Sequence, residues 1–516
     1  MKRFAFILVM VGWCLSIGAK TVSIPNAQTW TASWLNTYRG QTITFAEDWY
    51  VCNNYRDTYT ISPRRIFSPT NQALPQSAAY NTILSLNNQG TVTLTGVSGY
   101  HRMGERLHNL TVYVSSAYSL QLQSCEWVGN TRQEVEKGIN MADIDRRGKH
   151  NLLVCATNLQ YYLVENVGTG MGPGSQAAHN AQRTKVSQAL AKINADIYGV
   201  LEVEQGQAAM AELASDLSAR TGRHFAYIQD ATSPYGSYTK SGYIYCSDVV
   251  TPDGSLRLNN TAVVYRKYMQ AFRHKATGEC FIFSINHFKA KSGTGTGDDA
   301  DQGDGQGIFN ATRTREAQSV ISEYHNNKTY YDDDDLLIMG DLNAYAMEDP
   351  IQTLVFAGMT DLHRYFHADS SYSYVFHGQA GYLDHALCNA TLLPQVTGMS
   401  VYHINADEQI DYDYNSSDRT MFRCSDHDPV LVGLCLGQTA QAPSPYITCM
   451  ARPDAITLRN AEGGHVRIYD IHGQLMTDER VTTAQHDILT ADMPTGLYII
   501  HLYVNGEVIQ QKVMME

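Results

Sequence analysis

The sequence predicts an α/β sandwich as the largest part of the fold, and three observations support this prediction. From about residue 146 onward, short apolar strands alternate with segments of helical periodicity. Polar residues stand at the ends of those strands. Segments with β-type runs and little helical periodicity precede and follow this region. The alternating part is typical of helices packed on sheets, and the flanking parts indicate separate all-β domains.

Length and composition set limits on the class of protein. A chain of 516 residues is too long for one hydrophobic core, so we expect several domains. Hydrophobic residues make up 43% and charged residues 17%, which indicates a folded protein. The net charge of −13 argues against a general polyanion binder, because basic side chains supply most non-specific affinity for nucleic acid.

The first 19 residues have the composition of a signal peptide. Lys2 and Arg3 precede the apolar run FAFILVMVGWCLSIGA, which is short for a membrane span and ends in small residues. No other stretch is long enough to cross a bilayer, so we expect no stable membrane span. The oligomeric state is left open.

Nine cysteines remain after removal of residues 1–19, and export permits disulfides among them. Their scattered positions lack the paired spacing of zinc ligands. The odd number leaves at least one thiol unpaired, or paired between chains.

Residues 20–140 are predicted to form a small all-β accessory domain. Its β-type runs include QTITF, TVTLTGV and LTVYV, separated by Gly, Asn and Pro. Two interpretations stay open: a packing or substrate-presenting module, and a nucleic-acid-binding barrel of the OB type.

Residues 146–437 are predicted to form the α/β domain, and polar residues repeatedly end its apolar strands. These residues are Asn158, Glu202, His287, Asp341, Asn343, Asp384, His385, Asp426 and His427. A core strand has no packing reason to finish so often in Asp, Asn, Glu or His. We therefore expect most of these side chains to converge on one rim of the sheets.

Phosphodiester cleavage is the chemistry that fits these residue types. Glu202 and Asn158 offer hard oxygen ligands of the kind that Mg²⁺ prefers. Asp341 and Asn343 are two residues apart, so in extended backbone they face the same side. His427 can donate or relay a proton if a carboxylate, for which Asp384 is a candidate, holds its other ring nitrogen.

At this point the sequence resembles a known family, the secreted bacterial nucleases of the endonuclease/exonuclease/phosphatase superfamily, which share the fold of deoxyribonuclease I. The resemblance covers residues 146–437. It is carried by the segments GVLEVE, INHFKAKSG, DDADQGDGQGIFNATRTREAQ, MGDLNAYAMEDPIQ, YSYVFHGQAGYLDHAL, HINADE and SDHDPVLVG.

The resemblance implies a four-layered sandwich, in which two packed sheets are flanked by helices, and it implies roles for individual residues. Asn158 and Glu202 would bind the metal, and Asp426 would complete the acidic cluster on the metal side. Asp341 would orient the attacking water, Asn343 would hold the phosphate and His287 would bind the scissile phosphate. His427, paired with Asp384, would be the catalytic histidine.

The implied activity is that of an extracellular endonuclease that hydrolyses DNA with little sequence preference, and RNA is a further candidate substrate. Mg²⁺ or Mn²⁺ is the expected ion, with Ca²⁺ as a further candidate because the loop from Ser292 to Gly307 carries carboxylates at suitable spacing. A solvated loop is the preferred interpretation of this segment. The sequence departs from the family pattern at Gln205, which puts a role for Glu204 in doubt, and at Ile308, where a cysteine is expected.

Two groups of basic residues lie near the expected site. Arg183, Arg313 and Arg315 begin predicted helices, where they would either contact phosphates or form structural salt bridges. Lys289 and Lys291 are the candidates for steering DNA.

The C-terminal part begins after the linker QTAQAPSPY at residues 438–446. Residues 447–516 form a β-type unit whose RIYDIHGQL hairpin, MPTGLYII step and closing QQKVMM strand resemble the C-terminal sorting domain of the type IX secretion system. This resemblance implies export through the periplasm to the cell surface or the medium, with the secretion machinery as a partner. An ordinary β-sandwich binding module is the alternative.

Other functions remain open on the same residues. A phosphatase or a lipid-headgroup phosphodiesterase of the same fold would use the same catalytic set, because fold does not fix substrate. A non-catalytic surface adhesin is the alternative from a different class, and it would be favoured by loss of a metal-binding or histidine residue. All of these residues are present here.

Overall fold

The computed structural model of the protein describes most of the chain in two compact units. The described ranges are 19–54, 58–230, 239–258, 267–437, 448–451, 455–459, 461–470, 474–483, 485–490, 493–504 and 507–515. The predicted linker lies outside these ranges, as does the predicted signal peptide apart from its last residue. One unit comprises the described residues up to Ile66 together with Leu86–Thr131, and the other comprises Phe67–Ser85 and the chain from Arg132 onward.

The N-terminal unit is built on a seven-stranded sheet. Its strands are β1 (Lys20–Val22), β2 (Thr42–Phe45), β3 (Trp49–Asn53), β4 (Tyr59–Ser62), β5 (Val92–Thr95), β6 (Arg106–Ser116) and β7 (Ser119–Val128). The order is β1-β2-β6-β3-β4-β5-β7, and an additional pairing between β6 and β7 closes five of the strands into a barrel. This five-stranded ring has the strand number of an OB-type barrel. The buried indole of Trp49 lies in its core.

The part of the second unit up to residue 437 contains two six-stranded sheets. We call this part the catalytic unit, because the resemblance described above implies that it carries the chemistry. The first sheet has the order β10-β11-β9-β8-β21-β20 and the second has the order β12-β13-β14-β15-β19-β16. The strands of the first are β8 (Leu152–Tyr162), β9 (Ile197–Glu204), β10 (Phe225–Tyr227), β11 (Thr239–Cys246), β20 (Val396–Val401) and β21 (Val430–Leu434). Those of the second are β12 (Val250–Leu258), β13 (Lys267–His274), β14 (Cys280–Asn286), β15 (Leu336–Asp341), β16 (Thr360–Asp361) and β19 (Asp384–Cys388).

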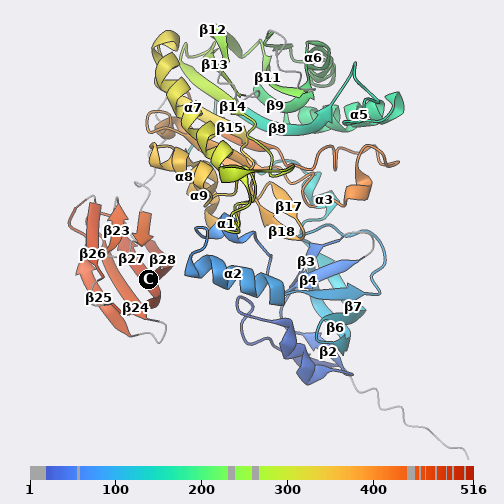
Figure 1. The fold of residues 1–516 in the computed structure, drawn as a ribbon, viewed down its shortest axis with the longest axis vertical. Coiled ribbons are helices and arrows are strands. Elements are labelled where there is room, and N and C mark those ends of the chain that lie inside the picture. The colour runs from blue at the N-terminus through green and yellow to red at the C-terminus, as the bar shows by residue number, and fades with distance from the viewer. Residues whose placement is uncertain are drawn as a thin grey trace, which may run out of the picture. The chain divides into compact units, whose positions relative to one another are not determined.

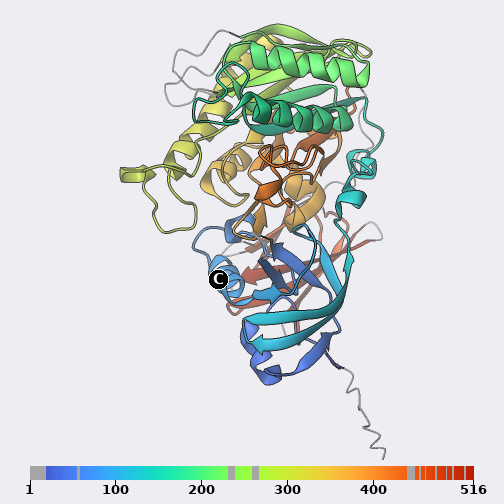
Figure 2. The same cartoon turned by 90° about the vertical axis from the view of Figure 1, so that its right-hand side faces the viewer.

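Helices cover the outer faces of both sheets, which confirms the predicted four layers (Figure 1). The helices α5 (Gln176–Ile193) and α6 (Ala208–Thr221) lie side by side on the first sheet (Figure 2). The helices α7 (Asn310–Tyr331) and α8 (Asp349–Phe356) pack on the second. Three apolar cores result, one under each helical layer and one between the sheets. Burial of these apolar faces is the main stabilising contribution.

Local sequence explains the β8–α5–β9 unit that carries two of the candidate residues. The Ser175 hydroxyl caps the start of α5 by accepting a hydrogen bond from the Ala178 N–H. Asn194 ends the helix in the left-handed conformation. The chain then returns as β9, which pairs in parallel with β8. The carboxyl ends of β8 and β9 therefore lie at the same edge of the sheet.

A segment from the N-terminal part of the sequence belongs to the catalytic unit. We call Phe67–Ser85 the strap; it includes α1 (Pro69–Gln72) and the start of α2 (Ala78–Gln89). Its Ser68 N–H donates to the Ala380 carbonyl at 2.8 Å. The predicted domain boundary at residue 140 assigned the strap to the N-terminal domain. The sequence did not reveal its place in the catalytic unit, because its partners lie about 300 positions later in the chain.

Shorter elements complete the catalytic unit. They are α3 (Arg132–Val135), α4 (Met141–Ile144), α9 (Leu362–His367), β17 (Tyr374–Phe376) and β18 (Gln379–Gly381). The strands β17 and β18 form a separate two-stranded hairpin. No helix among the described residues is long and apolar enough to cross a membrane.

The C-terminal region folds as two small sheets. One contains β22 (Thr448–Ala451), β23 (Ala455–Arg459) and β26 (Gln485–Leu489), and the other contains β24 (His465–Asp470), β25 (Leu475–Arg480), β27 (Gly496–Val504) and β28 (Glu507–Met515). A shared apolar core with Ile456, Ile468 and Ile500 joins the sheets into a sandwich. The predicted C-terminal β-sandwich is thereby confirmed.

Seven of the cysteines in the described part of the chain are buried, and Cys125 is half-buried. Burial raises the pKa of the Cys52 thiol to about 11. Because the thiolate is the reactive form, such thiols are protected from oxidation by burial.

We predict that Asn71→Ala destabilises the catalytic unit by about 1–3 kcal/mol, because the buried Asn71 Oδ1 accepts a hydrogen bond from the Tyr382 N–H at 3.1 Å. Urea unfolding measures the effect. Asn81→Ala, at an exposed position of α2, is the matched control and should change stability by less than about 0.5 kcal/mol. Equal stability of the two variants would show that the strap is not integral to the unit.

Candidate active site

Both sheets contribute side chains to one buried cluster. Asn158 lies on β8 and Glu202 on β9 of the first sheet, and Asp341 ends β15 of the second. Asp384 begins β19 and pairs directly with Asp341, since β15 and β19 are antiparallel. The start of β19 therefore lies at the same edge as the end of β15.

The histidines reach this edge from the flanking connections. His287 immediately follows β14. His427 precedes β21, whose antiparallel pairing with β8 brings it toward the end of β8. Gly340 permits a close backbone approach, because a Cβ there would lie 2.0 Å from the Asn286 carbonyl oxygen.

The Oδ2 atom of Asp341 is at the centre of the cluster. Asn158 Nδ2 donates to it at 3.2 Å. His287 Nε2 lies 3.6 Å away and His427 Nε2 lies 3.8 Å away. The two imidazoles thus face the carboxylate at distances longer than a hydrogen bond. The side chain of Asp341 is only 2% exposed, so its charge has little access to water.

Glu202 lies beside Asp341 in a strained backbone conformation. Its Oε1 accepts from Asn158 Nδ2 at 3.1 Å and lies 3.7 Å from His287 Nε2. Its Oε2 accepts from the Tyr161 N–H at 3.1 Å. The φ of Glu202 is +56°, a conformation that side-chain-bearing residues rarely adopt and that is concentrated at functional sites.

His427 and Asp384 form a hydrogen-bonded pair. The Nδ1 of His427 donates to Asp384 Oδ2 at 2.7 Å. The Ser373 hydroxyl donates to the same oxygen at 2.7 Å. Because Nδ1 carries the proton in this bond, the pair directs Nε2 of His427 toward Asp341.

The negative charge around His427 determines its protonation. Burial alone lowers the pKa of His427, but the carboxylates of Asp384, Asp341 and Asp426 outweigh this effect and raise it well above the usual value. Burial raises the pKa of Asp341, although His427 opposes the shift. His427, which can donate a proton, therefore lies next to Asp341, whose carboxyl group binds a proton more tightly than usual.

The backbone of His427 is fixed by hydrogen bonds between the HINADE and SDHD segments. The Asn405 Nδ2 donates to the His427 carbonyl at 2.6 Å. The buried Asp428 accepts from the N–H groups of Asn405 and Ala406 and from His403 Nδ1. These contacts tie residues 403–406 to the segment that carries His427. The sequence analysis did not single out Asn405, Asp428 or Ser373.

The chemistry of the donor set fits a divalent cation. Glu202 and Asp341 present two carboxylates that share one amide donor, and hard oxygen donors suit Mg²⁺. Among the described residues, Asp341, Asp384 and His427 also form a group whose ligand atoms lie within 4.8 Å of one another. In that group Nδ1 of His427 is occupied by Asp384, so Glu202 and Asp341 are the better pair of ligands.

The side chains of Asn158 and Asn343 make hydrogen bonds that the sequence did not predict. Asn158 directs its nitrogen toward the carboxylates, while its oxygen accepts from the Gln160 N–H at 2.9 Å. Rotation of this amide would be needed for it to act as a ligand. Asn343, at φ +48°, donates to the Phe288 carbonyl at 3.1 Å. Asp426 is half-buried, and its carboxylate is one of those that raise the pKa of His427.

Several basic residues near the predicted site have structural partners. Arg183 pairs with Asp216 through two 2.7 Å hydrogen bonds. The buried Arg313 donates to the carbonyls of Lys289, Gln306 and Ile308, and so fixes the Gly-rich loop.

Lys291 and Glu204 are likewise structural. Lys291 bonds both oxygens of the buried Glu348, at 2.5 and 2.6 Å. The buried Glu204 accepts from the N–H groups of Val164, Glu165 and Asn166. The pairing with Glu348 argues against DNA steering by Lys291. The backbone hydrogen bonds of Glu204 argue against a catalytic role for that residue.

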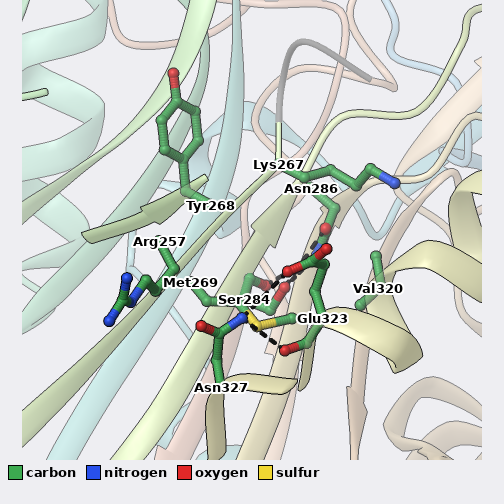
Figure 3. A pocket seen from close by; sticks show the side chains of 9 residues that line it. All are labelled: Arg257, Lys267, Tyr268, Met269, Ser284, Asn286, Val320, Glu323 and Asn327. Carbon is green, nitrogen blue, oxygen red and sulfur yellow. Dashed lines mark hydrogen bonds between the residues drawn. The ribbon is translucent and has the colours of Figure 1, made fainter. Parts of the chain in front are cut away.

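A small cavity lies outside this cluster, between α7 and the strands β12–β14 (Figure 3). Lys267, Ser284, Asn286, Glu323 and Asn327 are among its lining residues. Its volume of about 10 Å³ has room for about one water molecule. None of the candidate catalytic side chains lines it.

Comparisons with known proteins identify the family to which the chain belongs. Residues 158–427, more than half of the chain, match the endonuclease/exonuclease/phosphatase family. The chain belongs to this family, whose members are hydrolases that act on phosphoester bonds and typically depend on divalent metals. Residues 453–516 match the secretion system C-terminal sorting domain, which indicates export and a secreted or cell-surface location. The predicted endonuclease/exonuclease/phosphatase domain and the predicted sorting domain are thus confirmed.

Solved structures similar to this chain include three that each cover 55% of it. The human Nocturnin catalytic domain with bound sulfate is 14% identical, with 93% of that chain covered and a TM-score of 0.36. A family protein from Bacteroides thetaiotaomicron is 17% identical, with 97% covered and a TM-score of 0.35. A mannosyl-6-phosphatase of the same organism is 16% identical, with 100% covered and a TM-score of 0.35. No curated protein matches the chain.

We predict that Asp384→Asn lowers the pKa of His427, because the substitution removes the largest interaction that raises it. The imidazolium should consequently lose its proton at lower pH than in the unmodified protein. An NMR titration of the histidine resonances in metal-free protein measures this. Asp369→Asn, at an exposed position, serves as the control. An unchanged His427 titration in Asp384→Asn would contradict the electrostatic account of the pair.

Proposed function

We propose that the protein is an extracellular, divalent-metal-dependent endonuclease that hydrolyses phosphodiester bonds of DNA with little sequence preference. The observation that carries the proposal is the convergence of Glu202, Asp341 and the His427–Asp384 pair at one buried edge of two sheets. Membership of the family and the sorting domain support a secreted phosphoester hydrolase. That the substrate is DNA is the further step that we propose beyond a secreted phosphoester hydrolase.

Glu202 and Asp341 would hold the cation, Mg²⁺ or Mn²⁺, with Asn158 and Asp426 in support. When bound, the cation would neutralise charge on the phosphate and polarise it. Ca²⁺ is a further candidate for the same role or for the Gly-rich loop. In that loop Asp301 and Asp304 already accept hydrogen bonds from backbone N–H groups.

The chain's own residues would perform the proton transfers. Asp341, as a ligand of the cation, would orient the attacking water. His427 is protonated more readily than a free histidine and would donate from Nε2 to the phosphate or to the leaving oxygen. Asp384 would keep the imidazole in the required orientation. His287 and Asn343 would bind the phosphate oxygens.

The domain organisation follows as part of the proposal. Residues 1–19 would direct export across the inner membrane, and 20–140 would form an accessory domain apart from the strap. Residues 146–437 would carry the chemistry, 438–446 would act as a linker, and 447–516 would engage the secretion machinery.

We predict that the purified protein cleaves DNA and that a chelator abolishes the activity. Double-stranded DNA, single-stranded DNA, RNA and sphingomyelin are compared, each with and without chelator. Asp341→Ala and His427→Ala should lower DNA hydrolysis by at least about a hundredfold, as expected for loss of a charge-stabilising or proton-transfer group. His325→Ala, an exposed histidine on α7, is the control. Cleavage of sphingomyelin but not DNA would replace the nuclease by a lipid-headgroup phosphodiesterase.

We predict that deletion of residues 445–516 leaves the activity of the purified enzyme essentially unchanged, while the protein accumulates in the periplasm of its native host. The reason is that the C-terminal sandwich has its own core and contains none of the candidate catalytic residues. Cell fractionation of the full-length and truncated proteins measures the location. Normal secretion of the truncated protein would exclude the sorting role, and loss of activity would make the tail part of the catalytic support.

A further inference from the structure

Three rings form a row that leads outward from the catalytic histidine. The ring of Tyr374 stacks on His427, with centroids 4.7 Å apart and an interplanar angle of 30°. The ring of Phe376 is nearly parallel to that of Tyr374, at 6.4 Å and 15°. Tyr374 and Phe376 are two residues apart on β17, so their side chains project from the same face of the strand.

Exposure increases along this row. His427 is 7% exposed, Tyr374 is half-buried, and Phe376 is 54% exposed. An aromatic side chain that stays in water beside a buried polar cluster does not contribute to the core of the fold. The ring of His377 also lies next to that of Phe376, with centroids 4.1 Å apart and an interplanar angle of 68°. The part of the Phe376 side chain that remains exposed is available to another ring, and stacking of aromatic rings is favourable.

The hairpin that carries the row is fixed to the rest of the catalytic unit. Its second strand, β18, is tied to the strap by the bridge between Phe67 and Ala380 and by the Ser68 N–H. The Asn71 side chain binds the backbone N–H of Tyr382, just after β18. A ring held in this way is preorganised, so binding to it costs little ordering of the protein.

A cation lies beside the same row. Arg423 is buried and lies close enough to Tyr374 to interact with it electrostatically. One of its N–H groups donates to the Asn405 carbonyl at 3.1 Å, and its Nε has no hydrogen-bond partner in the described part of the chain. A nucleotide combines a flat ring with a phosphate, so the rings can stack on the base while the nearby positive charge favours the phosphate electrostatically.

We propose that Tyr374 and Phe376 form a stacking wall that binds an unpaired nucleobase next to the scissile phosphate, so that single-stranded DNA is preferred over duplex DNA. This inference rests on the proposed function and names the form of its substrate. The face of a base inside a duplex is covered by its neighbours, whereas a base in a single strand can stack on a protein ring. The stacking wall can therefore bind a base of a single strand but not a base inside a duplex.

The test compares kcat/KM for a single-stranded oligonucleotide, the same sequence as a duplex, and bis(4-nitrophenyl) phosphate. The variants are Phe376→Ala, Phe376→Trp and, as a control, Phe356→Ala, which removes an 84% exposed ring at the end of α8. Phe376→Ala should lower kcat/KM for the single strand about tenfold more than for the small diester, mainly through KM. Phe376→Trp should restore the loss, and Phe356→Ala should leave all three rates unchanged.

The possible failures are distinguishable. An equal effect of Phe376→Ala on the single strand and on the small diester would overturn the stacking wall while leaving the nuclease in place. An equal loss on duplex and single strand would also overturn it, because the contact would then be to the backbone. Hydrolysis of the diester by the unmodified protein without cleavage of either DNA would instead refute the proposed function.

Discussion

The repulsion between buried carboxylates is the constraint on which the rest of the site depends. Glu202, Asp341, Asp384 and Asp426 are drawn toward one edge of two sheets, where water can solvate them only in part. Removing like charges from water costs several kcal/mol for each ion unless partners compensate. Here the compensation comes from His427, from the Asn158 amide and, in our account, from a cation. Closely spaced carboxylates would destabilise a purely structural core, but phosphoester chemistry requires them.

The fold holds these charges together by a small number of rigid connections. The pairing of β15 with β19 places Asp341 opposite Asp384, and the parallel β8 and β9 present Asn158 and Glu202. The hydrophobic cores on either side of each sheet keep these strands in register. The strap and the buried Asp428 hold segments that lie outside the two sheets. Without these contacts, such segments would be the most mobile part of the site.

The sequence predicted the sheets and the strand-end residues, because both depend on local patterns of apolar and polar residues. Asp341 could be found since it directly ends the apolar run LLIMG. Ser373 and Asn405 could not, because their partners Asp384 and His427 are 11 and 22 residues away and small polar residues are common in loops. The strap contacts residues about 300 positions distant, and no local pattern records such a contact. One signal was available for Tyr374: an aromatic residue every second position in YSYVF, close to the LDH motif.

The location of the cation tests this account most directly. Crystals of the full-length protein soaked in Mn²⁺ would reveal the ion by its anomalous scattering. The account predicts a peak in contact with the carboxylates of Glu202 and Asp341, with the hydrogen bond between His427 Nδ1 and Asp384 intact. The peak should vanish in Glu202→Gln at the same Mn²⁺ concentration. A peak coordinated by Asp384 and His427 instead would contradict the account, because the pair that is assigned here to proton transfer would then be the metal site.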